Sequence, residues 1–253
     1  MLTLLSPAKK LNEEGQELDN NSLPIFIEDA EKLIKSLRKY NPKKLGGLMK
    51  LSETLSELNV DRYAEWELDH SQKVKPAALT FNGEVYTGLD ANSFSEKEKE
   101  TAQNNLRILS GLYGILKPFD LIHPYRLEMG TKLKVGRKNN LYEFWGDKIV
   151  NEINQNLTTQ KENVIVNLAS NEYFKSVNKK KLDARIVTPV FKDFSNGQYK
   201  TVMVYAKKAR GMMARYIIKN AIEKAADIVA FDTAGYCYNK EASTENEIVF
   251  YRG

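Results

Sequence analysis

The sequence has few of the side chains that build redox or metal centres. Cys237 is its single cysteine, and His70 and His123 are its only histidines. A disulfide within the chain is therefore excluded, and no recognised zinc or iron ligand spacing can be assembled. A lone thiol in a chain of 253 residues is typical of a reducing compartment. We therefore expect a cytoplasmic protein without a metal or other cofactor, with Cys237 as a packed or inert thiol.

Long apolar runs and nucleotide-binding glycine loops are also missing. Residues 1–10 hold only a few apolar side chains before a proline, which excludes a signal peptide. No stretch reaches the roughly 18 apolar residues that a membrane-spanning helix needs. Neither the Walker nor the Rossmann glycine pattern occurs. Ser110, His123 and Asp120 would supply a catalytic triad, but no nucleophile-elbow motif accompanies them.

What is present is the composition of an ordinary globular protein. Hydrophobic residues make up 42% of the chain, charged residues 28% and aromatic residues 10%, which excludes wholesale disorder. No repeat, low-complexity tract or long linker marks a boundary. We expect a single domain over residues 1–253, of a mixed α/β class with a mixed sheet and flanking helices.

Hydrophobic periodicity predicts the elements of this fold. The predicted strands are Leu2–Leu5, Pro76–Phe81, Asn163–Leu168, Ala184–Phe191, Tyr199–Ala206, Ile228–Phe231 and Ile248–Tyr251. The predicted helices are Glu28–Lys39, Glu96–Leu106, Leu141–Leu157 and Ala206–Ala226. Ser170 and Asn171 follow a predicted strand and are a suitable cap for a short helix through Val177. Ligands often bind at such strand-to-helix turns.

Near the N-terminus the pattern predicts a helix-hairpin-helix element over about residues 28–59. Asn41-Pro42 ends the first helix, Gly46-Gly47 supplies the turn, and a second helix carries Leu48, Leu51, Leu55 and Leu58. Lys43, Lys44 and Lys50 flank the glycine pair. Backbone N–H groups at such a turn can approach a phosphate, although a glycine pair between helices is more often a plain connection.

Positive charge is concentrated in one segment. The net charge is +5, and Lys200–Lys224 contains seven cations against the single carboxylate of Glu223, whereas Glu13–Glu31 is acidic. On a helix, Lys208, Arg215 and Lys219 share one stripe. We expect apolar neighbours to enclose Arg215 in part, so its guanidinium needs a carboxylate, carbonyls or a phosphate as partner. Two interpretations remain open: an internal ion pair, with Glu172 or Asp232 as partner, and an anion-binding cleft whose ligand is a phosphate.

A second polar cluster lies in the segment Leu109–Lys132. Its glycines, tyrosines and charged side chains include Tyr113, Tyr125, Arg126, Glu128 and Lys132. Aromatic and cationic groups interleaved in this way can stack bases and hold phosphates. The alternative is a turn-rich structural loop with half-buried tyrosines.

Six stretches of the chain are similar to one known family. They read LLSPAKKL, NGEVYTGLDA, LSGLYGILKPFDLIHPYRLEMGTKL, LYEFWGDKI, VNLASNEYFKSV and YAKKARGMMARYII. In these stretches the sequence resembles the YaaA family, described as peroxide-stress proteins, and together they span nearly the whole chain.

The resemblance implies a family-specific α/β fold with a positively charged cleft and a helix-hairpin-helix element. It also implies DNA binding and a role in limiting iron-driven oxidative damage to DNA. Carried over to this sequence, the cleft candidates are Lys9, Lys10, Arg126, Lys132, Lys207, Lys208, Arg210 and Arg215. The hairpin candidates are Lys43, Lys44 and Lys50. The adjacent glycines depart from the h-x-G-h-G pattern of DNA-repair hairpins.

Two functional hypotheses follow. The first is a non-catalytic protein that holds duplex or branched DNA without sequence preference, through phosphate contacts, under peroxide stress. The second is an enzyme acting on a nucleotide or nucleobase, in which Tyr113, Arg126, Glu128, Asn171 and Arg215 converge on one pocket. Whether those five side chains meet in the folded chain distinguishes the two.

Overall fold

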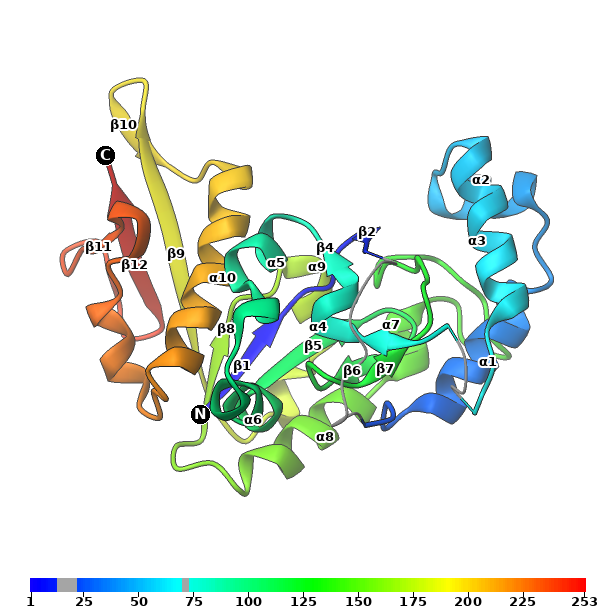
Figure 1. Cartoon of the computed structure of the whole chain (residues 1–253), viewed down its shortest axis with the longest axis horizontal. Coiled ribbons are helices and arrows are strands. Elements are labelled where there is room, and N and C mark those ends of the chain that lie inside the picture. The colour runs from blue at the N-terminus through cyan, green and yellow to red at the C-terminus, as the bar shows by residue number, and fades with distance from the viewer. Residues whose placement is uncertain (13–21, 70–72) are drawn as a thin grey trace.

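The computed structural model describes residues 1–12, 22–69 and 73–253, and within them a mixed eight-stranded sheet organises the fold. The strand order is β11-β12-β9-β8-β1-β5-β6, with β10 paired to β9 (Figure 1). The strands of this sheet are β1 (Leu2–Leu5), β5 (Leu106–Ser110), β6 (Gly114–Leu116), β8 (Val164–Asn167), β9 (Arg185–Ser195), β10 (Gln198–Lys200), β11 (Cys237–Tyr238) and β12 (Glu247–Arg252). The central pairs β5-β1, β1-β8, β8-β9 and β9-β12 are parallel, and β6, β10 and β11 are antiparallel to their neighbours.

Two short ribbons accompany the main sheet. β2 (Lys10–Leu11) pairs with β4 (Phe81–Asn82), and β3 (Lys75–Pro76) pairs with β7 (Leu121–Ile122). The mixed α/β class predicted from periodicity is confirmed.

Ten α-helices occur in the described part of the chain. They are α1 (Ile27–Leu37), α2 (Pro42–Met49), α3 (Glu53–Glu65), α4 (Ala77–Thr80), α5 (Glu84–Leu89), α6 (Glu96–Asn105), α7 (Leu141–Trp145), α8 (Lys148–Leu157), α9 (Asn171–Phe174) and α10 (Met203–Lys219). Four 3₁₀ turns also occur, η1 (Ala91–Ser93), η2 (Lys179–Lys181), η3 (Ala225–Ala230) and η4 (Thr233–Gly235). α10 packs on β9 and β1, and α8 packs beside β6. Helices α1 to α3 lie at one end of the molecule and strands β9 to β12 at the other (Figure 1).

The buried strands explain why several predictions from sequence are confirmed. Every residue of β1 and β8 is buried, because parallel strands in the middle of such a sheet are covered on both faces. In β9 the odd-numbered positions from Val187 to Asp193 are buried and the even-numbered ones are half-exposed. The predicted strand at Ile248–Tyr251 and the predicted helices at Glu28–Lys39 and Glu96–Leu106 are also present.

The predicted glycine hairpin is wrong, because Gly46 and Gly47 lie inside α2. Asn41 caps this helix by accepting a hydrogen bond from the Lys44 N–H, and Pro42 occupies the first turn, where proline is favoured. A Cβ at Gly46 would lie 2.9 Å from the Ser56 hydroxyl of α3. The glycine therefore permits close packing of α2 against α3 and does not form a turn.

The apolar face predicted for the second helix of this element is also wrong. Leu55 and Leu58 are exposed, and α3 instead buries Ser56, Asn59 and Tyr63. The Asn59 side chain donates to the Leu55 carbonyl, which lets a polar residue occupy the buried face.

Four more boundaries differ from the predictions. The segment Pro76–Phe81, predicted as one strand, instead contains the end of β3, helix α4 and the start of β4. The predicted strand Ile228–Phe231 falls largely in the 3₁₀ turn η3. The predicted helix at Leu141–Leu157 divides into α7 and α8 at Gly146, whose φ is +50°. The predicted strand at Tyr199–Ala206 ends at Lys200, and α10 begins at Met203. The helix begins early because helical spacing buries a stripe of α10, namely Ala206, Ala209, Met213 and Ile217.

A close crossing fixes α10 against α5. A Cβ at Gly211 would lie 1.8 Å from the Val85 carbonyl oxygen, and one at Gly88 would lie 2.2 Å from the Lys208 carbonyl oxygen. The two backbones therefore touch where each helix has a glycine. This contact positions the N-terminal half of α10 and its basic side chains.

Candidate nucleic-acid interface

The loops after β1 and β8 meet at a switch point of the sheet. β1 lies between β5 and β8, and the chain extends the sheet first on the β5 side and later on the β8 side. In open α/β sheets ligands bind outside the carboxyl ends of the strands at such a point. Here the Ser170 N–H donates to Ser6 Oγ at 2.9 Å, and Tyr86 donates to the Ser6 carbonyl at 3.0 Å. The switch point is thus bridged by hydrogen bonds.

A charged cluster lies beside this point. Glu128 Oε1 lies 3.1 Å from Lys9 Nζ and 3.0 Å from an Arg126 nitrogen. The Gly130 N–H donates to the Glu172 carboxylate at 2.9 Å, which ties the segment that carries Arg126 and Glu128 to α9. One carboxylate serves two cations, so the cluster keeps a net positive charge. Sequence alone placed all three residues among the candidates but did not pair Lys9 with Glu128.

The five residues of the enzyme hypothesis do not form one pocket. Arg126 and Glu128 pair with each other, and Asn171 opens α9 and lines a separate cavity of about 670 Å³. Tyr113 is fully buried, and its hydroxyl accepts from Trp66 Nε1 at 2.9 Å and from the His123 N–H. Burial raises the pKa of Tyr113 well above that of a free phenol. Tyr113 is therefore a core residue, more deeply buried than the half-buried tyrosines that the structural-loop interpretation expected.

Arg215 is held by the chain itself. Its guanidinium lies 3.2 Å from the Asp90 carboxylate, donates to the Leu89 and Asp90 carbonyls, and lies 5.6 Å from the ring of Phe94. Partial enclosure and an internal ion pair are both as predicted. The predicted partners, Glu172 and Asp232, are wrong because α10 packs against α5, and Asp90 directly follows that helix.

Arg210, on the same helix, differs from Arg215 in its contacts. It is only partly exposed, burial lowers the pKa of its guanidinium, and within the described residues it has neither a hydrogen bond nor an ion pair. Lys207 and Lys208 beside it are exposed. We call these three side chains the α10 basic surface. An arginine that is partly desolvated without a protein partner is a favourable site for an anion.

The other arginines that are not exposed have interaction partners, so a partly buried arginine without one is unusual among the described residues. Arg107 donates to Asn156 and to two carbonyls, Arg126 pairs with Glu128, and Arg252 lies 2.6 Å from Asp193. Arg62 also has an interaction partner. The remaining predicted phosphate-binding residues are exposed, namely Lys10, Lys43, Lys44, Lys50 and Lys132.

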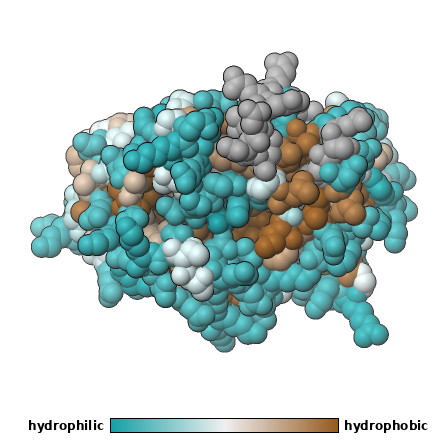
Figure 2. Space-filling model, turned by 60° about the horizontal axis from the view of Figure 1, so that its bottom comes forward, coloured by the Kyte–Doolittle hydropathy of each residue, from teal (hydrophilic) through white to brown (hydrophobic). Residues whose placement is uncertain are grey.

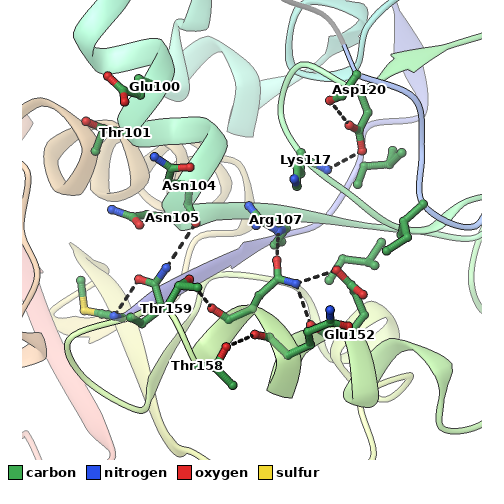
Figure 3. A pocket seen from close by; sticks show the side chains of 18 of the residues that line it. Glu100, Thr101, Asn104, Asn105, Arg107, Lys117, Asp120, Glu152, Thr158 and Thr159 are labelled. Carbon is green, nitrogen blue, oxygen red and sulfur yellow. Dashed lines mark hydrogen bonds between the residues drawn. The ribbon is translucent and has the colours of Figure 1, made fainter.

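The largest cavity described here lies at the opposite, amino edge of the sheet, and sequence reasoning missed it. It has a volume of about 1040 Å³ and is lined largely by polar and charged side chains, many of them from α6, α8 and the turn after α8 (Figure 3). Arg107 lies in its wall, where burial lowers the pKa of the guanidinium to about 10. Leu23 and Ile25, which are exposed, are among its lining residues. Figure 2 shows hydrophobic residues gathered in one area of the face that it draws. No motif marks these residues in the sequence.

Three further observations concern the cysteine, possible metal ligands and the length of the helices. Of the two alternatives expected for Cys237, a packed or an inert thiol, the packed one is wrong, because Cys237 is exposed in β11. In the described ranges, which omit His70, no group of three or more His, Cys, Asp or Glu side chains is placed to hold a metal ion. None of the helices in those ranges is long and apolar enough to cross a membrane.

Comparisons with known proteins confirm the resemblance seen in the sequence. The family model described as peroxide stress protein YaaA matches residues 1–242. A UPF0246 protein of Aliivibrio fischeri strain MJ11 is 53% identical over 255 residues, covering 100% of this chain and 98% of that protein. A UPF0246 protein of Tolumonas auensis is 52% identical, with coverage of 100% and 98%, and one of Shewanella pealeana is 51% identical, with coverage of 100% and 99%. The chain therefore belongs to the family described as peroxide stress protein YaaA.

Proposed function

We propose that this protein binds DNA in the peroxide stress response, through phosphate contacts made by the α10 basic surface. The observation that carries the proposal is the partly buried guanidinium of Arg210, which has no partner among the described residues and lies on the same helix as the exposed Lys207 and Lys208. Arg forks bidentately onto phosphate oxygens, and the lysines add point charges that tolerate any base sequence. Lys9 and Arg126, which share one carboxylate, extend the positive charge at the carboxyl edge of the sheet.

Phosphate binding suggests how such a protein limits iron-driven damage. A cationic surface that neutralises DNA phosphates releases the counterions condensed on them. Ferrous ions associate with DNA in this way, and the radicals that they generate from peroxide react close to where they form. Displacing the metal from the phosphates would move the radical source away from the bases.

The direct test is the affinity for a fluorescently labelled duplex, measured by anisotropy. The triple variant Lys207→Ala, Lys208→Ala, Arg210→Ala should weaken duplex binding by at least about tenfold, because each lost phosphate contact removes counterion release. Unchanged affinity would contradict the proposal.

The control is a triple variant of equal charge change. Lys39, Lys97 and Lys240 are exposed and lie on three other parts of the molecule. Alanine at these positions should change affinity only by the small amount expected from lower net charge. Equal losses in both triple variants would indicate general attraction to DNA and would contradict an assignment to α10.

A second candidate function is an enzyme acting on a nucleotide or nucleobase. The observation that favours it is the Lys9, Glu128 and Arg126 cluster at the switch point of the sheet, where ligands bind in open α/β folds. A thermal-shift screen of nucleotides and bases distinguishes the two functions. Stabilisation by a nucleotide that Glu128→Gln abolishes would favour the enzyme, and stabilisation by duplex DNA alone would favour the binding protein.

A further inference from the structure

The large cavity at the amino edge of the sheet has the features of a second binding site. Its lining includes no residue of the α10 basic surface. Its volume of about 1040 Å³ is at the upper end of the range for sites that hold small organic ligands. Ile115 and Leu116 of β6, together with Leu23 and Ile25, add apolar surface to its polar wall. The cavity therefore has the size and the mixed lining of a small-molecule site.

Arg107 supplies a buried cation to this cavity. Only 5% of the residue is exposed, yet it is part of the lining. Its Nε donates to Asn156 Oδ1 at 2.6 Å, and its Nη1 donates to the Gln103 and Leu106 carbonyls. Its Nη2 has no partner among the described residues, and it is not one of the fully enclosed atoms that lack a partner. The two N–H groups of Nη2 therefore remain available to an acceptor on a ligand.

Two carboxylates flank this guanidinium without pairing with it. Asp120 and Glu152 lie on either side of Arg107 (Figure 3). Burial lowers the pKa of Arg107 and these two carboxylates oppose that shift, but neither forms an ion pair with it in the described ranges. Both Asp120 oxygens accept hydrogen bonds from the protein. One Glu152 oxygen accepts from Asn156 Nδ2 at 2.6 Å, and the other has no partner within the described chain. Glu152 thus keeps an acceptor for a donor group of a ligand.

Positive and negative side chains are balanced around the cavity. The lining includes four cationic and four anionic side chains, namely Lys97, Arg107, Lys117 and Lys161 and Glu100, Asp120, Glu152 and Glu223. Lys161 and Glu223 already pair with each other. A polyanion such as DNA gains little from a site in which the charges cancel. A small ligand that carries one charge of each sign gains from both.

The end of α8 provides a position for the positive charge of such a ligand. Gln155 and Asn156 near the end of this helix, and Thr158 and Thr159 after it, line the cavity. The C-terminus of a helix carries a partial negative charge, and the last turn of α8 contains no basic residue that would neutralise it. Glu152 adds a full negative charge about one turn earlier. This part of the wall therefore favours an ammonium group, whereas Arg107 favours a carboxylate.

We propose that this cavity binds a small zwitterion of the amino acid or short-peptide class, with its carboxylate on Arg107 Nη2 and its ammonium at Glu152 and the end of α8. The amide side chains in the wall both donate and accept hydrogen bonds, which suits peptide groups. The apolar lining residues suit an apolar side chain. A single amino acid would leave much of the volume to water, so the size favours a short peptide. The inference goes beyond DNA binding and does not depend on it.

The test is isothermal titration calorimetry of the full chain with the tripeptide Gly-Gly-Leu and with free leucine. Saturable binding is expected, and the tighter of the two probes identifies the source of the zwitterion. The C-terminal amide of that probe lacks the carboxylate and should bind at least about tenfold more weakly, because a charge-assisted hydrogen bond to Arg107 is lost. The N-acetylated probe lacks the ammonium and should bind about fivefold more weakly.

Glu152→Gln tests whether the probe lies in this cavity. The variant keeps an oxygen that can accept from Asn156 and removes the charge. It should weaken binding of the free probe about fivefold and leave binding of the N-acetylated probe unchanged, because that probe has no ammonium to lose a partner. The matched control, Glu57→Gln, removes an exposed carboxylate of α3 that does not line the cavity, and should change neither affinity. The α10 triple variant should also bind the probe like the wild type.

Three results would overturn the inference. The first is the absence of saturable binding of both probes at concentrations up to about 10 mM. The second is equal affinity of the wild type for the free and the amidated probe. The third is a Glu152→Gln variant that binds the free probe like the wild type, because binding would then lie elsewhere. None of these results affects the duplex measurement on the α10 variants, so a failure here is distinguishable from a failure of DNA binding.

Discussion

At the scale of single residues, Arg210 and Arg215 show how one helix can hold two arginines in different ways. Arg215 is neutralised by Asp90 and two carbonyls, so a ligand would have to displace protein partners. Arg210 is partly desolvated, and no described residue forms a hydrogen bond or an ion pair with its guanidinium. Such an arrangement reduces stability unless a ligand compensates, which is common at binding sites.

Replacing Arg210 by an apolar residue of similar length tests this trade-off. Arg210→Met should raise the free energy of unfolding of the free protein by about 1 kcal/mol, because an uncompensated cation is replaced by a side chain that burial favours. The same variant should bind duplex DNA more weakly. Urea unfolding and anisotropy measure the two effects. A loss of stability on substitution would mean that Arg210 supports the fold.

His123 should give the protein a pH-dependent stability. Burial lowers the pKa of this imidazole below its ordinary value of 6.5, while the carboxylates of Glu67, Asp69 and Glu65 oppose the shift. Between the lowered pKa and 6.5 the unfolded chain binds more protons than the native one, so stability falls as pH falls through that window.

The expected result is a fall in the free energy of unfolding as the pH is lowered below the imidazole's ordinary pKa of 6.5. Urea unfolding of the wild type and of His123→Gln across this range measures it. The variant should lose less stability than the wild type on acidification. Parallel curves for the two proteins would contradict the assignment to His123.

At the scale of elements, the crossing of α5 and α10 determines where the basic side chains lie. Because backbone atoms of one helix occupy the space of a Cβ on the other, neither Gly88 nor Gly211 can carry a side chain without moving a helix. The α10 basic surface therefore depends on a contact in which the charged side chains have no part.

Alanine substitution at two helical glycines tests this crossing. Gly211→Ala should lower the free energy of unfolding by about 3 kcal/mol or more, since its Cβ would lie 1.8 Å from a carbonyl oxygen. Gly47→Ala in α2 has no atom within 4 Å of the new Cβ. It should raise stability by about 0.5–1 kcal/mol, because alanine favours the helix. Similar effects at the two sites would contradict the packing described for α5 and α10.

Local patterns predicted the elements that are uniform along their length, such as the apolar runs of β1 and β8. They failed where packing overrides the pattern. Thr201 to Tyr205 alternate like a strand, yet Met203 begins α10 because the residues that follow bury a helical stripe. Gly46 has the appearance of a turn residue, but its role is set by Ser56 of the neighbouring helix, a contact that no local rule reveals.

At the scale of the whole molecule, the candidate site was predicted in part. The concentration of charge in Lys200–Lys224 is visible in the sequence and indicates a basic surface. The partners of each cation are not visible, because Lys9 meets Glu128 and Arg215 meets Asp90 across more than a hundred residues of chain. Only the fold shows that Arg210, rather than Arg215, lacks a partner among the residues that the structure describes.

The salt dependence of duplex affinity tests the central claim most directly. For the wild type, the logarithm of the binding constant should fall steeply with the logarithm of salt concentration between about 50 and 200 mM. The triple variant Lys207→Ala, Lys208→Ala, Arg210→Ala should flatten the slope by about 2–3, since each neutralised phosphate contributes about 0.9. A slope equal to that of the wild type would contradict the claim that α10 binds DNA phosphates.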